Sequence, residues 1–262
     1  MGREHVDGSP VARITRLGLT PVKGMEHVSL PSVDLTADGP RHDRVFCLVD
    51  PGTGAVLRTV SNDALLACRA SLDPPVLTMR TPLGEASGVV VDGPAMTGDY
   101  WGSEVRLVTV AGPWSELLSS YLGRSVVLCR SVDPGAIVWG GSVSIVTTSS
   151  LDDLSRRLGR PADDGARFRA TVVVDTGQAP PFVEDDWVGK RVRLGTATVT
   201  VRGPLPRCAV VERRPGAGGQ DARVLAALTP DRHHAGEIRF GVHADVEEPG
   251  TVAFGEPVVA PA

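Results

Sequence analysis

The amino-acid sequence predicts a mainly β protein with a few helices, which places it in the α+β class. Short runs rich in Val, Ile, Leu and Thr recur along the chain. Turn residues separate these runs, with 30 Gly and 21 Pro among 262 residues. Helix start and stop signals mark about three stretches. Many short strands with frequent turns favour a small barrel or a strongly bent sheet.

The first 110 residues are predicted to form strands joined by tight turns. Alternating apolar residues predict a strand over 11–22, and the apolar run Val45–Val49 predicts a buried strand. Asp50–Gly54 predicts a tight turn, after which 56–60 can pair back as a hairpin. A short helix is expected over 63–69. Further strands are expected at 28–30, 33–35, 76–79, 89–91 and 105–110.

Three longer helices are expected in the rest of the chain. A Pro at the first helical position and Gly123 after the last one mark a helix over 113–122. Ser caps, basic residues in the last turn and Gly159 mark a second helix over 149–158. A third helix over 221–228 is expected to end before a Thr-Pro pair.

The stretch around which the second half is organised is Gly203–Glu212. The β-branched run Ala197–Arg202 predicts a strand that leads into it. Pro204 and Pro206 have no backbone N–H, so we expect them to stop the hydrogen-bonded ladder before a new strand at 209–211. Other strands are expected at 126–129, 143–147, 170–174, 191–194, 238–242 and 251–254.

Charge and composition exclude several classes of protein. A net charge of −4 gives no support for nucleic-acid or anionic-membrane binding. No apolar run approaches the roughly 18 residues of a membrane span. The polar residues 1–10 lack the apolar segment of a secretory signal, so we expect a disordered tail there. The four cysteines, Cys47, Cys68, Cys129 and Cys208, contain no C-x-x-C pair, which favours a reduced, cytoplasmic protein without zinc-knuckle or ferredoxin patterns.

Cys208 is the first candidate functional residue. It follows a Pro-rich turn and Arg207, and a neighbouring cation favours the thiolate, which is the form that attacks electrophiles and binds metals. A buried structural cysteine at a strand edge is the alternative, because free Cys is among the most buried residue types.

Three cations at strand ends are the second candidates. Lys23, Arg44 and Arg169 each stand where a side chain and free backbone N–H groups can meet an anion such as phosphate. Solvated charges that flank strands are the alternative. Other clusters give weaker signals: His233-His234 predicts an exposed loop, Glu184–Asp186 a solvated acidic loop, and Gly216–Gly219 lacks the Lys-Ser/Thr of a P-loop.

Taken in order, these pieces resemble the MOSC-domain family, and within it the two-part branch typified by the mitochondrial amidoxime reducing component and its bacterial relatives. The resemblance spans about residues 12–259. It rests on segments at Pro21–Lys23, Gly39–Phe46, Ser144–Leu151, Phe168–Val174, Asp186–Gly189, Arg207-Cys208, Phe240–Ala244 and Pro249–Val258.

The resemblance implies a MOSC-type β-barrel core over 121–262, preceded by a smaller β-rich domain over 11–120. It also implies that Cys208 is the thiolate ligand of molybdenum. The resemblance further implies which residues bind the molybdenum cofactor or line its site. Its phosphate and pterin would be held by Lys23, Arg44 and Arg169, and the cysteine would be flanked by Pro206 and Arg207. The pterin or the wall of the site would be contacted by Gly24, Ser142, Ser144 and Thr171.

The activity that the resemblance implies is reduction of N-hydroxylated or N-oxide small molecules. Electrons would come from a separate ferredoxin-, flavin- or cytochrome-type protein, because the sequence offers no second redox centre. Two alternatives stay open. One is a carrier of molybdenum cofactor or sulfur, or a sulfurtransferase, that uses Cys208. The other is a metal-free biosynthetic enzyme with Cys208 as nucleophile, which the departure of Arg213–Ala217 from the family's acidic D-P-x-T-G loop motivates.

Overall fold

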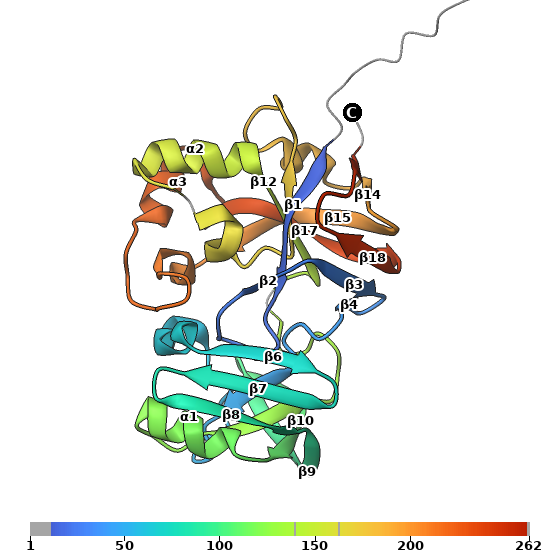
Figure 1. The fold of residues 1–262 in the computed structure, drawn as a ribbon. Coiled ribbons are helices and arrows are strands. Elements are labelled where there is room, and N and C mark those ends of the chain that lie inside the picture. Colours follow the sequence, from blue (N-terminus) through green and yellow to red (C-terminus); the bar gives the residue numbers. More distant parts are fainter. Residues whose placement is uncertain (1–11, 139, 162, 261–262) are drawn as a thin grey trace, which may run out of the picture.

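A computed structural model describes residues 12–138, 140–161 and 163–260 (Figure 1). The predicted tail over 1–10 lies outside these residues. Strands dominate the described chain, which contains three α-helices: α1 (Trp114–Leu122), α2 (Thr148–Leu158) and α3 (Val224–Arg232). The predicted class, mainly β with a few helices, is therefore confirmed.

A large mixed sheet organises the upper part of Figure 1. Among the described residues it has nine strands. In order these are β19 (Val258–Val259), β14 (Arg191–Leu194), β15 (Ala197–Arg207), β17 (Glu237–Glu248), β12 (Val143–Thr147), β13 (Val172–Asp175), β1 (Arg13–Leu19) and β2 (Val28–Leu30), with β16 (His233–His234) paired to β17. A short sheet, β18 (Gly250–Ala253), β3 (Ser32–Thr36) and β4 (Gly39–Pro40), encloses the same apolar core, and α2 and α3 pack over a second core. We call this assembly the large-sheet unit.

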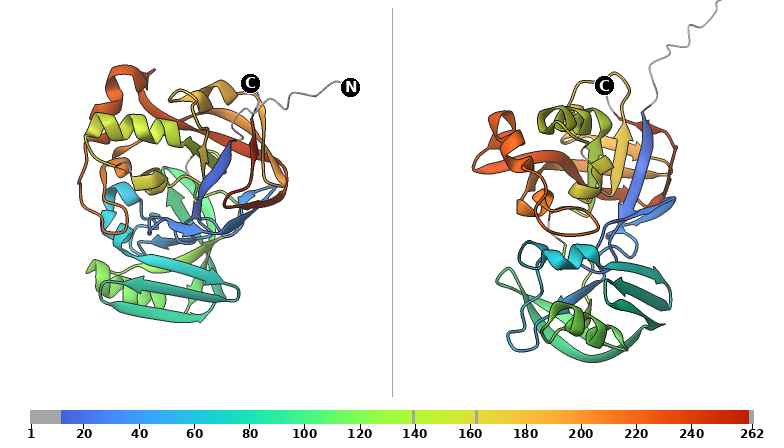
Figure 2. Two further views of the ribbon diagram at one scale, coloured as in Figure 1. Left: turned by 45° about the horizontal axis from the view of Figure 1, so that its top comes forward. Right: turned by 60° about the vertical axis from the view of Figure 1, so that its left-hand side comes forward.

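The lower part of Figure 1 is the small-sheet unit. One of its sheets contains β5 (Phe46–Val49), β11 (Val127–Ser131), β10 (Ser103–Ala111) and β9 (Val91–Tyr100). The other contains β6 (Arg69–Asp73), β7 (Val76–Thr81) and β8 (Gly84–Val89). Helix α1 packs on them because its buried Trp114 donates its indole N–H to the Leu77 carbonyl at 3.1 Å. Figure 2 shows the two units stacked end to end.

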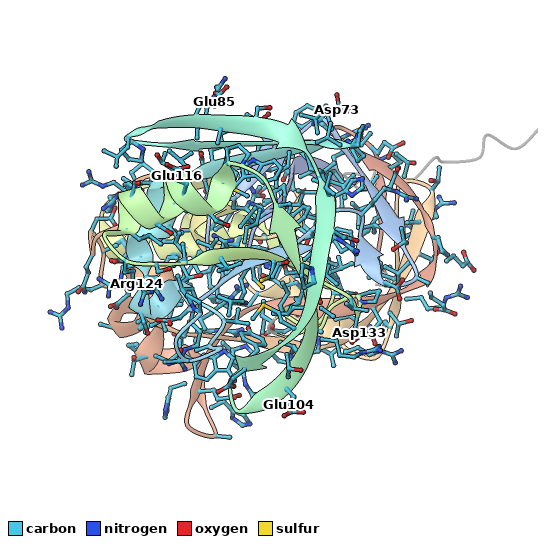
Figure 3. The ribbon with its side chains drawn as sticks, turned by 90° about the horizontal axis from the view of Figure 1, so that it is seen from below. Asp73, Glu85, Glu104, Glu116, Arg124 and Asp133 are labelled. Carbon is cyan, nitrogen blue, oxygen red and sulfur yellow. The ribbon has the colours of Figure 1, made fainter. Side chains whose placement is uncertain are left out.

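Charged side chains of both signs cover the end of the small-sheet unit that faces away from the large sheet. Figure 3 shows Glu104, Glu116 and Arg124 at this surface. Arg106 pairs with Asp133 on the same unit. The two signs of charge are thus interspersed at this surface.

The hydrogen-bonded sheets do not divide at the predicted boundary between residues 120 and 121. Strands β1 to β4, from the first forty residues, belong to the large-sheet unit. Strand β11, which follows residue 121, pairs with β5 and β10 in the small-sheet unit. The chain therefore passes between the units before β5 and again after β11, and both crossings lie near the candidate site.

The predicted end of a strand before Pro204 is wrong. β15 continues to Arg207, with Pro204 opposite Val242 and Pro206 opposite Arg239, and the register shifts near both prolines. β14 pairs with β15 only as far as Thr200, so the proline segment is an edge on that side. A residue without an N–H is tolerated at such an edge. The apolar run after Cys208 is a short helix, η5 (Ala209–Glu212), and not the predicted strand.

Several smaller predictions are also corrected. Thr147, and not a serine, caps α2 by accepting a hydrogen bond from the Ser150 N–H at 3.3 Å. Helix α3 begins later than predicted and includes Pro230 in its last turn. The predicted 56–60 hairpin is a single bridge between Val49 and Val56, followed by the short helices η1 (Thr59–Ser61) and η2 (Asp63–Ala67). The two histidines at 233–234 are exposed, but they form β16 and not a loop.

Candidate functional site

Lys23 lies where the two units meet. Its backbone N–H donates to the Phe46 carbonyl of β5 at 2.8 Å, which ties the residue to the small-sheet unit. The side chain is buried, and its ammonium donates to the Tyr100 hydroxyl at 2.8 Å and to the Ile137 carbonyl at 2.7 Å. Because an ammonium carries three N–H groups, these two bonds leave one donor for a further acceptor.

Arg44 and Arg169 meet at Thr20, the residue that follows β1. The Arg44 N–H donates to the Thr20 carbonyl at 2.7 Å. The Arg169 guanidinium donates to the Thr20 hydroxyl at 2.9 Å and to the Met25 carbonyl at 2.7 Å. Both arginines have a left-handed backbone, with φ of 48° and 54°. Such values are uncommon outside Gly and are found where the surroundings hold a functional residue in place.

The positive charges of Lys23, Arg44 and Arg169, which we call the cation cluster, act on one another. Burial, followed by Arg44 and Arg169, lowers the pKa of Lys23 from 10.5 to about 7. Burial and Arg44 likewise lower the pKa of Arg169. Asp43 faces the cluster: it pairs with the Arg44 side chain and accepts from the Thr20 N–H at 2.8 Å. Three cations against this carboxylate leave a net positive charge, which suits an anionic ligand.

Cys208 differs from the other cysteines in its exposure. All four cysteines are free thiols, and Cys208 is exposed whereas Cys47, Cys68 and Cys129 are buried. It follows the last residue of β15 and stands at the N-cap of η5. The thiol is therefore accessible and is held by a strand end and a short helix.

Arg207, which precedes Cys208, is held from two sides. Its Nε donates to the Phe240 carbonyl at 2.8 Å, and its Nη1 donates to the Phe168 carbonyl at 3.0 Å. Its Nη2 is buried without a hydrogen-bond partner among the described residues. Burial lowers the pKa of Arg207, Cys208 acts to raise it and Arg44 to lower it. Cys208 and Arg44, one member of the cation cluster, thus both act on Arg207.

The polar candidates on β12 and β13 are engaged with one another. The Thr171 N–H donates to the Ser144 hydroxyl at 3.0 Å, and the Ser144 N–H donates to the Thr171 hydroxyl at 3.2 Å. The Ser144 hydroxyl also lies 3.5 Å from the Arg169 carbonyl. This pair therefore supports the strained backbone of Arg169. Ser142 donates to the Ala244 carbonyl at 3.3 Å, away from the cluster.

The two remaining predicted residues contribute backbone and not polar side chains. Gly24 has a φ of 93° and follows Lys23 directly, with Leu65 close enough to restrict a side chain at that position. Pro206 lies in β15 opposite Arg239, two residues before Cys208. Both shape the chain next to a candidate ligand residue.

Sequence reasoning missed an aromatic pair at the tip of the β9–β10 hairpin. Tyr100 accepts the hydrogen bond from Lys23, and Trp101 is the next residue along the chain. The Arg58 guanidinium lies 4.2 Å from the Trp101 ring centroid. Burial raises the pKa of Tyr100, and Arg44, Cys208 and Arg58 also act on it. The available signal was the Tyr-Trp-Gly turn itself, in a chain with only 4% aromatic residues.

Glu184 is buried, so the predicted solvated acidic loop is wrong at this residue. It lies on η4 (Val183–Trp187), and its Oε2 accepts from the Thr147 hydroxyl at 2.6 Å and the Ser150 hydroxyl at 2.9 Å. Its Oε1 is buried without a hydrogen-bond partner among the described residues. Burial raises the pKa of this carboxyl. Glu184 also acts on Arg207, so it lies behind the strand that carries Cys208.

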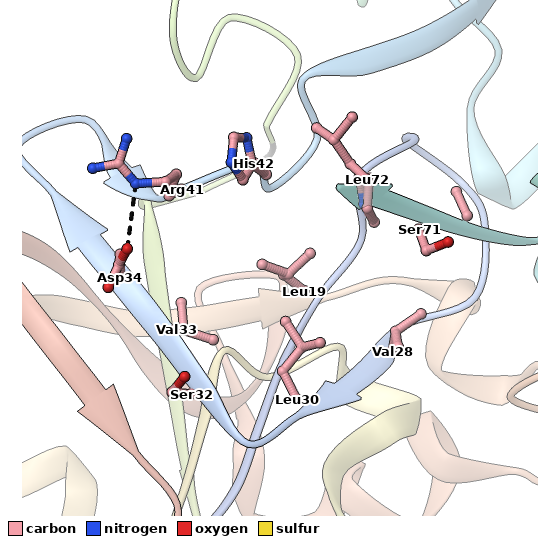
Figure 4. Close-up of a pocket in the computed structure, with 12 residues that line it drawn as sticks. Leu19, Val28, Leu30, Ser32, Val33, Asp34, Arg41, His42, Ser71 and Leu72 are labelled. Carbon is pink, nitrogen blue, oxygen red and sulfur yellow. Dashed lines mark ion pairs between the residues drawn. The ribbon is translucent and has the colours of Figure 1, made fainter. Parts of the chain in front are cut away.

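A pocket of about 250 Å³ lies beside the candidate site (Figure 4). Leu19 and Pro21, the two neighbours of Thr20 in the chain, line the pocket. Figure 4 shows Leu30 and Leu72 among its apolar lining side chains. The ion pair of Arg41 with Asp34 lies at its rim, with 3.5 Å between Nε and Oδ2. Cys208 and the cation cluster do not line this pocket. Thr20, which accepts the Arg169 hydrogen bond, stands in the chain between the two pocket residues Leu19 and Pro21.

Two features, a metal-binding cluster of side chains and a membrane-spanning helix, are absent from the described residues. No three His, Cys, Asp or Glu side chains lie together in a way that could hold a metal ion. No helix in the described part of the chain is long and apolar enough to cross a membrane. Within the described ranges, Cys208 is therefore not part of a group of three or more such side chains.

Two family models match this chain one after the other. Residues 11–125 match the model of the MOSC N-terminal beta barrel domain, and residues 137–259 match the model of the MOSC domain. Among curated proteins, the chain is similar to the molybdenum cofactor sulfurase of Drosophila grimshawi, with 23% identity over 256 residues. That match covers 88% of this chain but 32% of the relative, so the chain spans about a third of the relative's length.

Among solved structures, the chain is similar to the YuaD protein from Bacillus subtilis. The TM-score is 0.46 at 14% identity, and the match covers 95% of this chain and 94% of that one. A match to YiiM from Geobacillus stearothermophilus has a TM-score of 0.34 at 19% identity and covers 47% of this chain and 55% of that one.

Proposed function

We propose that this chain, in which a MOSC N-terminal beta barrel domain precedes a MOSC domain, binds molybdenum cofactor and reduces N-hydroxylated or N-oxide compounds. The observation that carries the proposal is the exposed Cys208 with Arg207 next to it, together with a cluster of three cations that Asp43 only partly balances. A soft sulfur donor and an anion-binding cluster suit a metal that arrives on an anionic organic carrier.

The residues present suit a metal that is carried by an anionic cofactor, for two reasons. A single cysteine is an incomplete ligand set, so a metal bound there must bring its other ligands with it. The buried Arg207 Nη2 has no partner among the described residues, and the unused donor of Lys23 is also available to an anion. A buried donor without an acceptor is costly, and an anionic cofactor would remove that cost.

The residues of the site would then divide between metal binding, anion binding and support of the strand. Cys208 would hold the metal, and Lys23, Arg44 and Arg169 would hold the phosphate and pterin. Arg207 would keep the Cys208 strand in place through its bonds to Phe168 and Phe240. When bound, the cofactor supplies the electron transfer that breaks an N–O bond. Reduction of an N-hydroxyl group or an N-oxide takes up two electrons and two protons and releases water, so a separate electron-transfer protein must supply the electrons.

The first experiment measures molybdenum by elemental analysis in protein made in a cofactor-competent host. We expect near-stoichiometric metal in the parent protein, and loss of both metal and N-hydroxyl reduction in Cys208→Ser and Cys208→Ala. Cys68→Ala is the matched control, because Cys68 is buried and packs in the small-sheet core. Metal content or activity that survives in both Cys208 variants would show that the thiolate is not the ligand.

A carrier or sulfur-transfer role is the second candidate. The similarity to part of a molybdenum cofactor sulfurase favours it, and so does the exposure of Cys208, since a thiol that exchanges cargo must be reachable. Turnover with an artificial donor separates the two candidates. A reductase loaded with cofactor should reduce N-oxides when reduced methyl viologen supplies electrons, whereas a carrier should bind the cofactor and show no turnover.

A further inference from the structure

The hairpin between β9 and β10 holds a tryptophan in an unfavourable backbone conformation. Tyr100 pairs with Ser103, so the turn consists of Trp101 and Gly102, with φ of 59° and 82°. Two-residue turns with positive φ at both positions prefer Asn-Gly or Asp-Gly, and a bulky residue at the first position is an outlier. A strained position occupied by Trp points to a role for its ring.

The Trp101 ring is fixed in place but remains half-exposed. Trp101 directly follows Tyr100, which is anchored by the hydrogen bond that it accepts from Lys23. The Arg58 guanidinium lies over the ring at 4.2 Å from its centroid. The side chain nevertheless has a relative exposure of 53%. A ring held in this way offers a preorganised apolar surface to a ligand.

This surface lies near Cys208. Arg58 is the N-cap of η1, Cys208 is the N-cap of η5, and these two short helices pack against each other. Tyr100, which directly precedes Trp101, is close enough to Cys208 and Arg44 for their charges to act on it. The ring therefore stands on the small-sheet side of the site, across from the thiol on the large-sheet side.

We propose that Trp101, backed by Arg58, is the substrate-facing wall of the site and selects planar aromatic N-oxygenated molecules over small aliphatic ones. This inference rests on the proposed reductase function and names its substrate class. Stacking on one aromatic ring gives about tenfold discrimination at the upper end of measured aromatic pairs. Arg58 holds the tryptophan ring, and Lys23 and Tyr100 do not themselves select the substrate.

The test compares quinoline N-oxide, which is planar, with trimethylamine N-oxide, which has no ring. Trp101→Asn removes the ring and places at the turn a residue that favours positive φ, so the hairpin is retained. We expect the ratio of kcat/KM for quinoline N-oxide to that for trimethylamine N-oxide to fall about tenfold, mostly through KM. Trp101→Phe keeps an aromatic face and should retain most of the ratio. Phe254→Asn is the control, since Phe254 is another exposed aromatic and lies in a turn of the large-sheet unit.

Binding without turnover gives the second readout. Calorimetric titration of the full chain with quinoline N-oxide, in the absence of an electron donor, should show binding that weakens about tenfold in Trp101→Asn. If the loaded protein reduces neither N-oxide, the reductase function fails, and the titration still decides whether Trp101 binds the ring. Equal losses for both substrates, together with unchanged quinoline N-oxide binding, would overturn the inference.

Discussion

Lys23 shows how a single residue in this site affects the stability of the ligand-free protein. Its ammonium has two oxygen acceptors, yet burial and two arginines lower its pKa from 10.5 to about 7. Between these two pH values the unfolded chain binds more protons than the folded protein, so stability rises with pH. At pH 6 the folded protein carries the full penalty of the buried charge. An anion at the site would offset that penalty.

Replacing Lys23 by Met should therefore stabilise the ligand-free protein at low pH. Each pKa unit corresponds to about 1.4 kcal/mol, and the Tyr100 and Ile137 oxygens would lose a donor, so we expect a net gain of about 1–3 kcal/mol at pH 6. The gain should vanish near pH 10. Urea denaturation at a series of pH values measures the free energy of unfolding.

Lys190→Met is the control for this prediction, because Lys190 is the only other lysine and lies in a partly exposed turn. It should show no comparable pH-dependent gain. A Lys23→Met variant that is destabilised equally at every pH would show that the ammonium forms favourable contacts that outweigh its burial. Phosphate or cofactor binding should be lost in Lys23→Met whichever way its stability changes.

For single residues of the site, charge and position along the chain could be predicted from the sequence, whereas burial could not. Lys23, Arg44 and Arg169 could be selected because each stands at the end of a predicted strand. Tyr100 and Glu184 could not, because their roles depend on partners 77 and 37 residues away in the chain, Lys23 and Thr147. The left-handed backbone of the two arginines is likewise set by contacts to Thr20 and Met25 and not by local sequence.

The N-terminus of α2 shows at the scale of an element how a helix and a short helix share one buried acid. Thr147 caps α2, and both its hydroxyl and that of Ser150 donate to Glu184 on η4. Burial raises the pKa of Glu184. The stabilising contribution of such a group is present below its unfolded pKa of about 4.5 and is lost as pH rises through the folded value.

Glu184→Gln should therefore become more stable relative to the parent protein as the pH increases. The amide keeps an oxygen for Thr147 and Ser150 but carries no charge to bury. We expect the difference in unfolding free energy to grow between pH 5 and pH 8. Asp186→Asn, an exposed change on the same short helix, should give a flat difference. A flat profile for Glu184→Gln would mean that the carboxylate is stabilised by its neighbours.

Predictions of strands and helices failed where sheet edges or helix ends changed the effect of a local sequence signal. Proline was expected to end a strand, but β15 passes Pro204 and Pro206 because β14 no longer pairs there. The apolar run after Cys208 was expected to be a strand, since three apolar residues do not distinguish strand from helix. The helices at 113–122 and 149–158 were close to correct, because Gly123 and Gly159 adopt the left-handed conformation that ends a helix.

At the scale of the whole molecule, the candidate site depends on chain segments that cross between the units. Lys23 and Arg44 come from the connections around β1 to β5, and Arg169 and Cys208 come from the large-sheet unit. Asp63 of η2 accepts from the Gly219 N–H at 3.3 Å and lies 3.4 Å from Arg213, which ties the loop after η5 to the small-sheet unit. The pairing of distant segments could not be predicted from the sequence, because the residue pattern of a strand does not indicate which other strand it pairs with.

A cut between residues 120 and 121 should therefore prevent the C-terminal part from folding alone. Strand β1 pairs with β13, and its buried Ile14, Leu17 and Leu19 belong to the core of the large sheet. Burial of three such side chains is worth about 1.5–3 kcal/mol each, which is comparable with the whole stability of a domain. Calorimetry should show no cooperative unfolding for 121–262 alone and a restored transition when 1–120 is co-expressed with it. The intact chain is the control. A cooperative transition of 121–262 alone, near that of the intact chain, would show that β1 is dispensable and that the division at 120 is a true domain boundary.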